Sequence, residues 1–146
     1  MKPKTIAYWI TTILVALPIG SGGVAQLALL QQNVDGFTRL LHYPAYFVPI
    51  LGFWKVAGAI VLLVPGFPRL KEWAYAGIVF DLTGAAASWV AVGGSDASAF
   101  HILAPLFIAA LAVASWALRP PGRTVGILFP EKNRTVAINP QAANMT

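Results

Sequence analysis

The chain has 146 residues, of which 58% are hydrophobic and only 10% are charged, whereas soluble domains carry about 25% charged residues, so this composition excludes an ordinary soluble domain. It contains no cysteine, which excludes disulfide exchange, thiolate catalysis, iron–sulfur clusters and thiolate zinc sites. The net charge of +5 does not indicate nucleic acid binding, because the basic residues stand at the ends of apolar runs rather than in a patch with interleaved aromatics.

Four apolar runs follow one another along the chain, each close to the roughly 20 residues that a helix needs to cross a bilayer. They cover residues 6–30, 46–64, 70–92 and 100–118, with turn-forming sequences between them at 31–36, 65–68 and 93–96. Unbroken apolar runs of this length exclude the alternating strands of a membrane β-barrel. We therefore predict an all-α, antiparallel four-transmembrane-helix bundle over residues 1–119 and a polar, flexible tail over residues 120–146.

Lysine and arginine residues gather on one side of the predicted bundle. The side that holds both termini and the second loop carries Lys2, Lys4, Arg69, Lys71, Arg119, Arg123, Lys132 and Arg134, whereas the other side carries Arg39. The positive-inside rule therefore places both termini in the cytoplasm. We expect Glu72, beside Arg69 and Lys71, to belong to a solvated charge cluster at this interface.

Two ionisable residues lie inside the predicted spans, Lys55 in the second and Asp81 in the third. A charge at bilayer depth is costly unless it is paired or faces a cavity. Helical spacing places each on a face of small residues. These are Gly52, Gly58 and Ala59 beside Lys55, and Ala74, Gly77, Gly84, Ala85 and Ser88 beside Asp81. Because small residues let helices approach closely, we predict that both faces pack inside the bundle and that Tyr75 and Leu82 face away.

The depths of the two charges predict an ion pair. At about 1.5 Å of rise per residue, Lys55 lies about 14 Å before the end of its helix and Asp81 about 16 Å after the start of the next. The short loop between the two helices makes them antiparallel neighbours. Two interpretations stay open: a structural pair that sets helix register, which contributes little net stability, or a functional site such as a ligand anchor, a proton relay or a transport path.

Two further polar residues complete the candidate site. Gln26 lies near the end of the first span, on one face with Thr11 and Gly22, and His101 lies near the start of the fourth. We expect both to face the bundle interior, where they would supply hydrogen-bonding groups beside Lys55 and Asp81. No set of catalytic residues and no set of metal ligands is predicted.

Three segments carry a family resemblance. Residues 42–55 read HYPAYFVPILGFWK, residues 65–77 read PGFPRLKEWAYAG, and residues 80–85 read FDLTGA. Together they resemble the DoxX-like family of small four-helix membrane proteins, over roughly residues 6–118. The positions that match the family's motif are Lys55, Glu72 and Asp81.

The resemblance implies a compact four-helix membrane bundle in a cell membrane, crossing it several times, and a bacterial inner membrane is the expected location. The wider DoxX group includes subunits similar to thiosulfate:quinone oxidoreductase and members linked to redox-stress complexes, and it is distantly similar to a vertebrate chaperone for nicotinic receptors. The absence of cysteine from this chain argues against a thiol-based redox role.

We expect a binding protein rather than an enzyme, holding a small apolar or amphipathic ligand, or a partner's helix, at Lys55, Asp81, Gln26 and His101. The alternative is a membrane subunit that exchanges electrons or protons with a quinone beside a soluble partner, which makes quinone the one candidate cofactor. A third hypothesis is a small proton-coupled transporter. The expected partners are the lipid bilayer, a second copy of the chain, or another membrane or soluble protein, but not nucleic acid.

Overall fold

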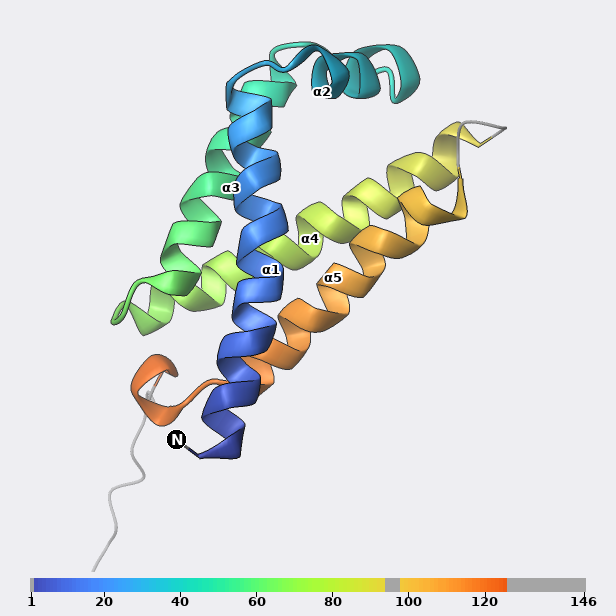
Figure 1. Ribbon diagram of the computed structural model, residues 1–146. Coiled ribbons are helices and arrows are strands. Elements are labelled where there is room, and N and C mark those ends of the chain that lie inside the picture. Colours follow the sequence, from blue (N-terminus) through green and yellow to red (C-terminus); the bar gives the residue numbers. More distant parts are fainter. Residues whose placement is uncertain (1, 94–97, 126–146) are drawn as a thin grey trace, which may run out of the picture.

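The computed structural model describes residues 2–93 and 98–125, and within these ranges every regular element is helical, as predicted (Figure 1). The elements are α1 (Pro3–Leu27), α2 (Gln31–Asp35), the π-helix η1 (Gly36–Leu40), α3 (Phe47–Leu63), α4 (Pro68–Val92), α5 (Ala99–Leu118) and the 3-10 helix η2 (Pro121–Arg123). The four long helices follow the four predicted apolar runs to within a few residues. Of these, α1, α4 and α5 are long and apolar enough to cross a membrane, whereas α3 has 17 residues.

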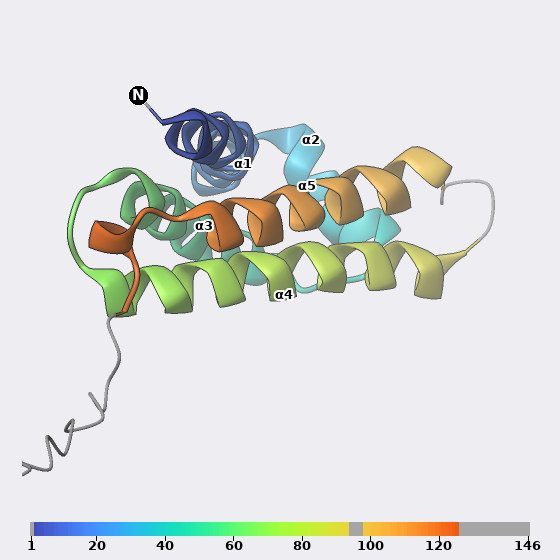
Figure 2. The ribbon, with the colours of Figure 1, turned by 90° about the horizontal axis from the view of Figure 1, so that it is seen from below.

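The long helices form two antiparallel pairs that cross each other. One pair is α1 with α3, and the other is α4 with α5. In Figure 1, α3 and α4 meet at their joining turn and diverge from there, and Figure 2 shows α4 and α5 side by side with α1 crossing over α5. The chain neighbours α3 and α4 therefore pack against each other less than either packs in its own pair.

The start of α1, the α3–α4 turn and residues 119–125 lie at one end of the molecule, which we call the base (Figure 1). The turn at the base has the predicted chemistry. Gly66 (φ +82°) and Phe67 (φ +51°) both adopt left-handed conformations, and Pro68 begins α4 at a position where its missing N–H costs no helical hydrogen bond.

At the opposite end, α2 and η1 together form a cap, residues 31–40. This corrects the prediction of a plain turn at residues 31–36. Side chains bond along the cap: Gln31 Nε2 donates to Asp35 Oδ1 at 3.0 Å, and Arg39 Nε lies 3.2 Å from the same oxygen. Left-handed residues, Leu29 (φ +50°) and His42 (φ +58°), turn the chain into and out of the cap.

The core is built from one stripe on each long helix. It contains Val15, Ile19, Ala59, Leu62, Tyr75, Ile78, Leu82, Ala109 and Ala112. On α3 the prediction was right, since Gly52, Ala59 and Leu62 are buried. On α4 it was wrong: Tyr75 and Leu82 are buried, whereas Gly77 and Gly84 are exposed.

The small residues of α4 therefore do not mark a close helix contact. The large side chains of Tyr75 and Leu82 fill the contact between α4 and the rest of the core, because they bury more apolar area than alanine or glycine. The small face, with Gly77 and Gly84, instead borders cavities beside α3. A face of small residues can border a cavity as readily as it can form a close helix contact. The spacing of these residues in the sequence does not distinguish the two cases.

Candidate functional site

An ion pair joins the middle of α3 to the middle of α4. Lys55 Nζ lies 3.4 Å from Asp81 Oδ2, and the two side chains are only 17% and 14% exposed. The geometry is that of an ion pair rather than a good hydrogen bond, since Oδ2 is buried without a hydrogen-bond partner. This carboxylate oxygen therefore keeps unused accepting capacity in a setting where an unmade hydrogen bond is costly.

On the base side of the ion pair lies a cavity of about 500 Å³ between α3 and α4, which we call the basal cavity. Its walls are almost entirely apolar, and Gly58 and Gly77 make room for it. Trp54 and Trp73 line it and are 67% and 79% exposed. The basal cavity therefore opens onto the apolar outer surface of the helices.

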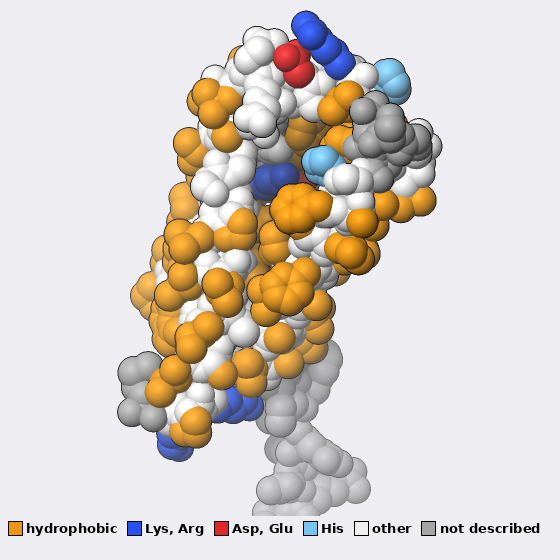
Figure 3. Space-filling model, turned by 45° about the vertical axis from the view of Figure 1, so that its right-hand side comes forward, with side chains coloured by type: hydrophobic (Ala, Val, Ile, Leu, Met, Phe, Trp, Pro, Cys, Tyr) orange, Lys and Arg blue, Asp and Glu red, His pale blue; other side chains and the backbone are white. Residues whose placement is uncertain are grey.

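On the other side lies a second cavity, of about 470 Å³, which we call the cap cavity. The cap contributes Gln32 and Asn33 to its wall, α4 contributes Ser88, and Lys55 and Asp81 line it as they line the basal cavity. Figure 3 shows a hollow on one face of the molecule with a basic and a histidine side chain in it. The ion pair thus stands between an apolar cavity and a more polar one.

His101 belongs to the cap cavity. Its ring stacks on Trp89 with centroids 4.3 Å apart, and its Nδ1 lies 2.8 Å from Ser98 Oγ. The ring of Tyr43, which also lines this cavity, stacks on Phe47 with centroids 5.1 Å apart, and its hydroxyl lies 2.9 Å from Ser88 Oγ. The cap cavity therefore has aromatic walls with polar groups at their edges.

Gln26 faces the interior of the bundle but lies in a helix contact rather than at a cavity. It is 3% exposed and packs in the contact between α1 and α3. The Cβ of Gln26 lies so close to Gly52 that any side chain at position 52 would clash with it. Gln26 lines neither cavity, and its Oε1 is buried without a hydrogen-bond partner. Lys55 and Asp81 therefore line both cavities, His101 lines the cap cavity from an exposed position, and Gln26 lines neither.

The position of Lys71 differs most from the expectation. The charge pattern placed it among the basic residues at the cytoplasmic surface. Its side chain is completely buried. Nζ donates to the carbonyls of Val61, Leu62 (3.2 Å) and Val64 (2.5 Å) at the end of α3. The last carbonyls of a helix have no hydrogen-bond partner within it and carry partial negative charge. A lysine there donates hydrogen bonds to them and places a positive charge beside them. The sequence gives no signal for this role, because basic caps are expected in the last turn of their own helix and Lys71 belongs to the first turn of the next one.

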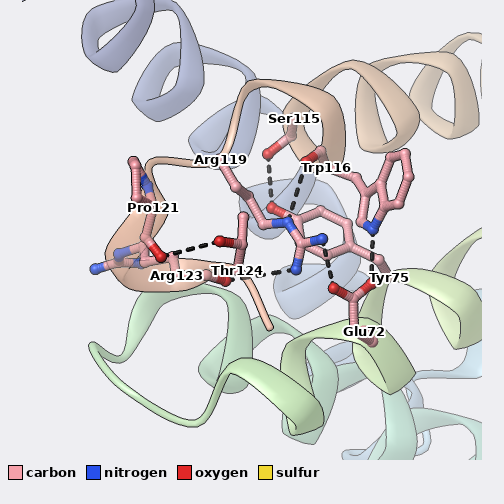
Figure 4. Close-up of polar contacts among 8 residues, drawn as sticks. All are labelled: Glu72, Tyr75, Ser115, Trp116, Arg119, Pro121, Arg123 and Thr124. Atoms are coloured by element: carbon pink, nitrogen blue, oxygen red, sulfur yellow. Dashed lines mark hydrogen bonds and ion pairs between the residues drawn. The ribbon is translucent and has the colours of Figure 1, made fainter. Parts of the chain in front are cut away.

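Glu72 is partly exposed, but it pairs with Arg119 rather than with Arg69 or Lys71, its neighbours in the sequence. Its Oε1 accepts from Arg119 Nη2 at 2.6 Å and its Oε2 accepts from Trp116 Nε1 at 2.7 Å, as Figure 4 shows. The guanidinium of Arg119 lies over the ring of Tyr75 as well, 5.2 Å from its centroid. Glu72 therefore ties α4 to the end of α5.

Residues 120–125, which we expected to begin a flexible tail, fold against the base. Arg123 Nη1 donates to Tyr8 Oη of α1 and to the Leu62 carbonyl of α3, each at 3.2 Å. Its guanidinium lies 4.5 Å from the ring centroid of Trp9. This segment straps the base, while the rest of the predicted tail, residues 126–146, lies outside the described residues.

A buried chain of hydroxyl groups links three helices near the base. Ser115 Oγ of α5 lies 2.7 Å from Thr12 Oγ1 of α1 and 2.8 Å from Tyr75 Oη of α4. Thr12 also donates to the carbonyl of Tyr8. Nothing in the sequence predicts these bonds, because single hydroxyl residues on three separate helices form no recognisable spacing.

The comparisons with known proteins add one assignment. A model of the DoxX-like family matches residues 10–115, which include α1, the cap, α3, α4 and most of α5. The chain belongs to the DoxX-like family. No curated protein and no solved structure matches it. Family and apolar helices together indicate a membrane protein.

Proposed function

We propose that this DoxX-like protein crosses the membrane four times and binds a small amphipathic molecule of the bilayer at the Lys55–Asp81 pair. The positive-inside rule places the base in the cytoplasm. The 17 residues of α3 span about 26 Å at the usual helical rise, close to the thickness of the hydrocarbon core. The two ends of the molecule carry most of the charged side chains in Figure 3, and apolar side chains cover its length.

The observation that carries the proposal is that the ion pair borders two cavities instead of lying in packed side chains. A pair that serves only to hold two helices together is best surrounded by tight packing, because a cavity beside it loses packing contacts and admits water that screens the attraction. Here Gly58 and Gly77 keep space beside it. Each cavity has the size of known ligand sites, roughly 300–1,000 Å³.

Filling each cavity in turn tests the proposal. Gly77 borders the basal cavity, Gly84 borders the cap cavity, and Gly22 borders neither. A Cβ added at any of the three meets no atom within 4 Å, and leucine is a better helix former than glycine. The variants Gly77→Leu, Gly84→Leu and Gly22→Leu should therefore fold alike.

The measurement is mass spectrometry of the lipids that copurify with each variant from native membranes. We expect an amphiphile that is retained by the wild type and by Gly22→Leu and is depleted from Gly77→Leu. The same lipid profile in all four proteins would contradict ligand binding at this site. Copurification of another membrane protein that Gly77→Leu prevents would instead favour a partner's helix as the occupant.

One observation supports the second candidate function, a membrane subunit that exchanges electrons with a quinone beside a partner protein. The basal cavity has tryptophan walls, Trp54 and Trp73, and an ammonium donor, Lys55, which suit a flat ring with carbonyl oxygens. Lys55 and the indole rings would hold and orient the quinone, and the quinone itself would carry the electrons. Quinone absorbance in the wild-type lipid extract that is missing from Gly77→Leu would support this candidate over other amphiphiles.

A further inference from the structure

We infer that the Lys55–Asp81 site selects an uncharged amphiphile whose head group is a hydroxyl, and this inference rests on the function proposed above. The proposed function requires only an amphipathic ligand. The charges and hydrogen bonds around the two cavities restrict its head group further.

The charges around the two cavities favour an uncharged head group. Among the described residues that line either cavity, Lys55 and Asp81 are the ones that carry charge when histidine is neutral. Their charges cancel. A carboxylate, phosphate or ammonium head would add a charge without a partner at a depth where the surroundings are apolar, which is expensive. An uncharged head adds none.

The hydrogen-bonding groups of Lys55 and Asp81 favour a hydroxyl. Lys55 Nζ has three N–H groups and no accepting capacity, and Asp81 Oδ2, 3.4 Å away, is buried without a hydrogen-bond partner. A head group that satisfies both must accept from the ammonium and donate to the carboxylate through the same small set of atoms. A hydroxyl does this with one oxygen, whereas an ether or ketone oxygen only accepts.

The shape of the basal cavity restricts the hydrocarbon part of the ligand. The basal cavity is apolar, begins at the ion pair and opens between Trp54 and Trp73 on the outer surface. A hydrocarbon chain can enter there directly from the bilayer. The basal cavity has a volume of about 500 Å³, the size of a site for a drug-sized ligand. This volume favours a slender single-chain molecule. The structure therefore points to a long-chain alcohol or an alkylphenol.

A set of matched probes tests this inference. The probes share one alkyl chain with a photoreactive diazirine and differ only in the head: alcohol, methyl ether, carboxylic acid or amine. The full-length protein is reconstituted in nanodiscs, illuminated with each probe over a range of concentrations, and analysed by mass spectrometry for covalent adducts. We expect the alcohol to saturate labelling at about tenfold lower concentration than the other three, the value of one hydrogen bond to a charged group.

Charge-changing variants sharpen the test. Asp81→Asn leaves the site with an unpaired positive charge, so its preference should shift from the alcohol to the carboxylic acid. Lys55→Met leaves a negative charge, so its preference should shift to the amine. Thr83→Val, an exposed position on α4 whose hydroxyl bonds to its own helix, is the matched control and should keep the preference for the alcohol.

The outcomes separate this inference from the proposed function. If all four probes label the wild type equally and Gly77→Leu removes that labelling, the hydroxyl preference is wrong and the binding site stands. A wild type that prefers the acid or the amine overturns the inference in the same way. If no probe gives saturable labelling that Gly77→Leu removes, both the inference and the proposed function fail.

Discussion

The base and the middle of the molecule treat their charged residues in opposite ways. At the base, Lys71 donates to three carbonyls, and Glu72 accepts from both Arg119 and Trp116. In the middle, Lys55 and Asp81 face each other at 3.4 Å, with one buried carboxylate oxygen unbonded and a cavity on either side. The base therefore uses its charges to hold helices together, whereas the middle leaves part of its bonding capacity unused.

This difference separates structural charges from candidate functional ones. A buried charge that serves only stability is expected to be fully hydrogen-bonded, because each unmade bond costs about 1–3 kcal/mol. Lys71 meets that criterion, and Asp81 does not. Substitutions at the base should therefore reduce stability most, and those in the middle should change binding more than stability.

The largest loss of stability is expected for Lys71→Met. The variant leaves the Val61 and Val64 carbonyls without their lysine donor, at about 1–3 kcal/mol for each group, whereas the Leu62 carbonyl keeps its bond from Arg123. We expect a total loss of more than about 3 kcal/mol, seen as a strongly lowered melting temperature in detergent. Arg69→Met, two residues earlier and exposed, is the control and should change little. Equal melting temperatures for the two variants would show that Lys71 is not the cap of α3.

A smaller effect is expected for the central pair. Asp81→Asn strands a lysine charge and should cost about 2–3 kcal/mol, whereas Lys55→Met/Asp81→Asn removes both charges and should cost about 1 kcal/mol. The comparison is made by thermal unfolding of both proteins in the same detergent. If the single and double variants have the same melting temperature, the two charges do not depend on each other for stability.

Next in size is Ser115→Ala, which breaks the buried hydroxyl chain at its centre. The variant removes the hydroxyl that bonds to both Thr12 and Tyr75, while Thr12 keeps its bond to the Tyr8 carbonyl, so we expect a loss of about 1–2 kcal/mol. Ser21→Ala provides a control, since Ser21 is exposed and makes only a long bond within its own helix. A loss no greater than that of Ser21→Ala would mean that the hydroxyl chain adds nothing to the base.

The smallest effect is expected for Arg39→Gln in the cap. Arg39 pairs with Asp35 four residues earlier, but its side chain is 75% exposed, and exposed pairs of this kind contribute at most about 0.5 kcal/mol. Thermal unfolding should barely distinguish the variant from the wild type. A larger loss would show that the cap is part of the stable core, and the contrast between the base and the rest of the molecule would need to be redrawn.

The amino-acid sequence was sufficient for the helices and for the position of the central charges. Long apolar runs leave a membrane helix as the element that satisfies every backbone group, so their bounds predict α1, α3, α4 and α5 closely. The turn 65–68 and the equal depth of Lys55 and Asp81 follow from local chemistry and helical rise. Family membership likewise follows from local strings of residues.

Tertiary structure alone decided which helices pair and what each polar residue does. The short turn predicts that α3 and α4 are neighbours, but α4, with Tyr75 and Leu82 in the core, packs more closely against α5. The helices α3 and α4 therefore diverge, and cavities form between them. Sequence spacing gives a residue's face on its own helix, not the partner that this face meets. For that reason Gln26 lay outside the cavities and Lys71 lay inside the fold: both depend on how the helices cross, which no single helix determines.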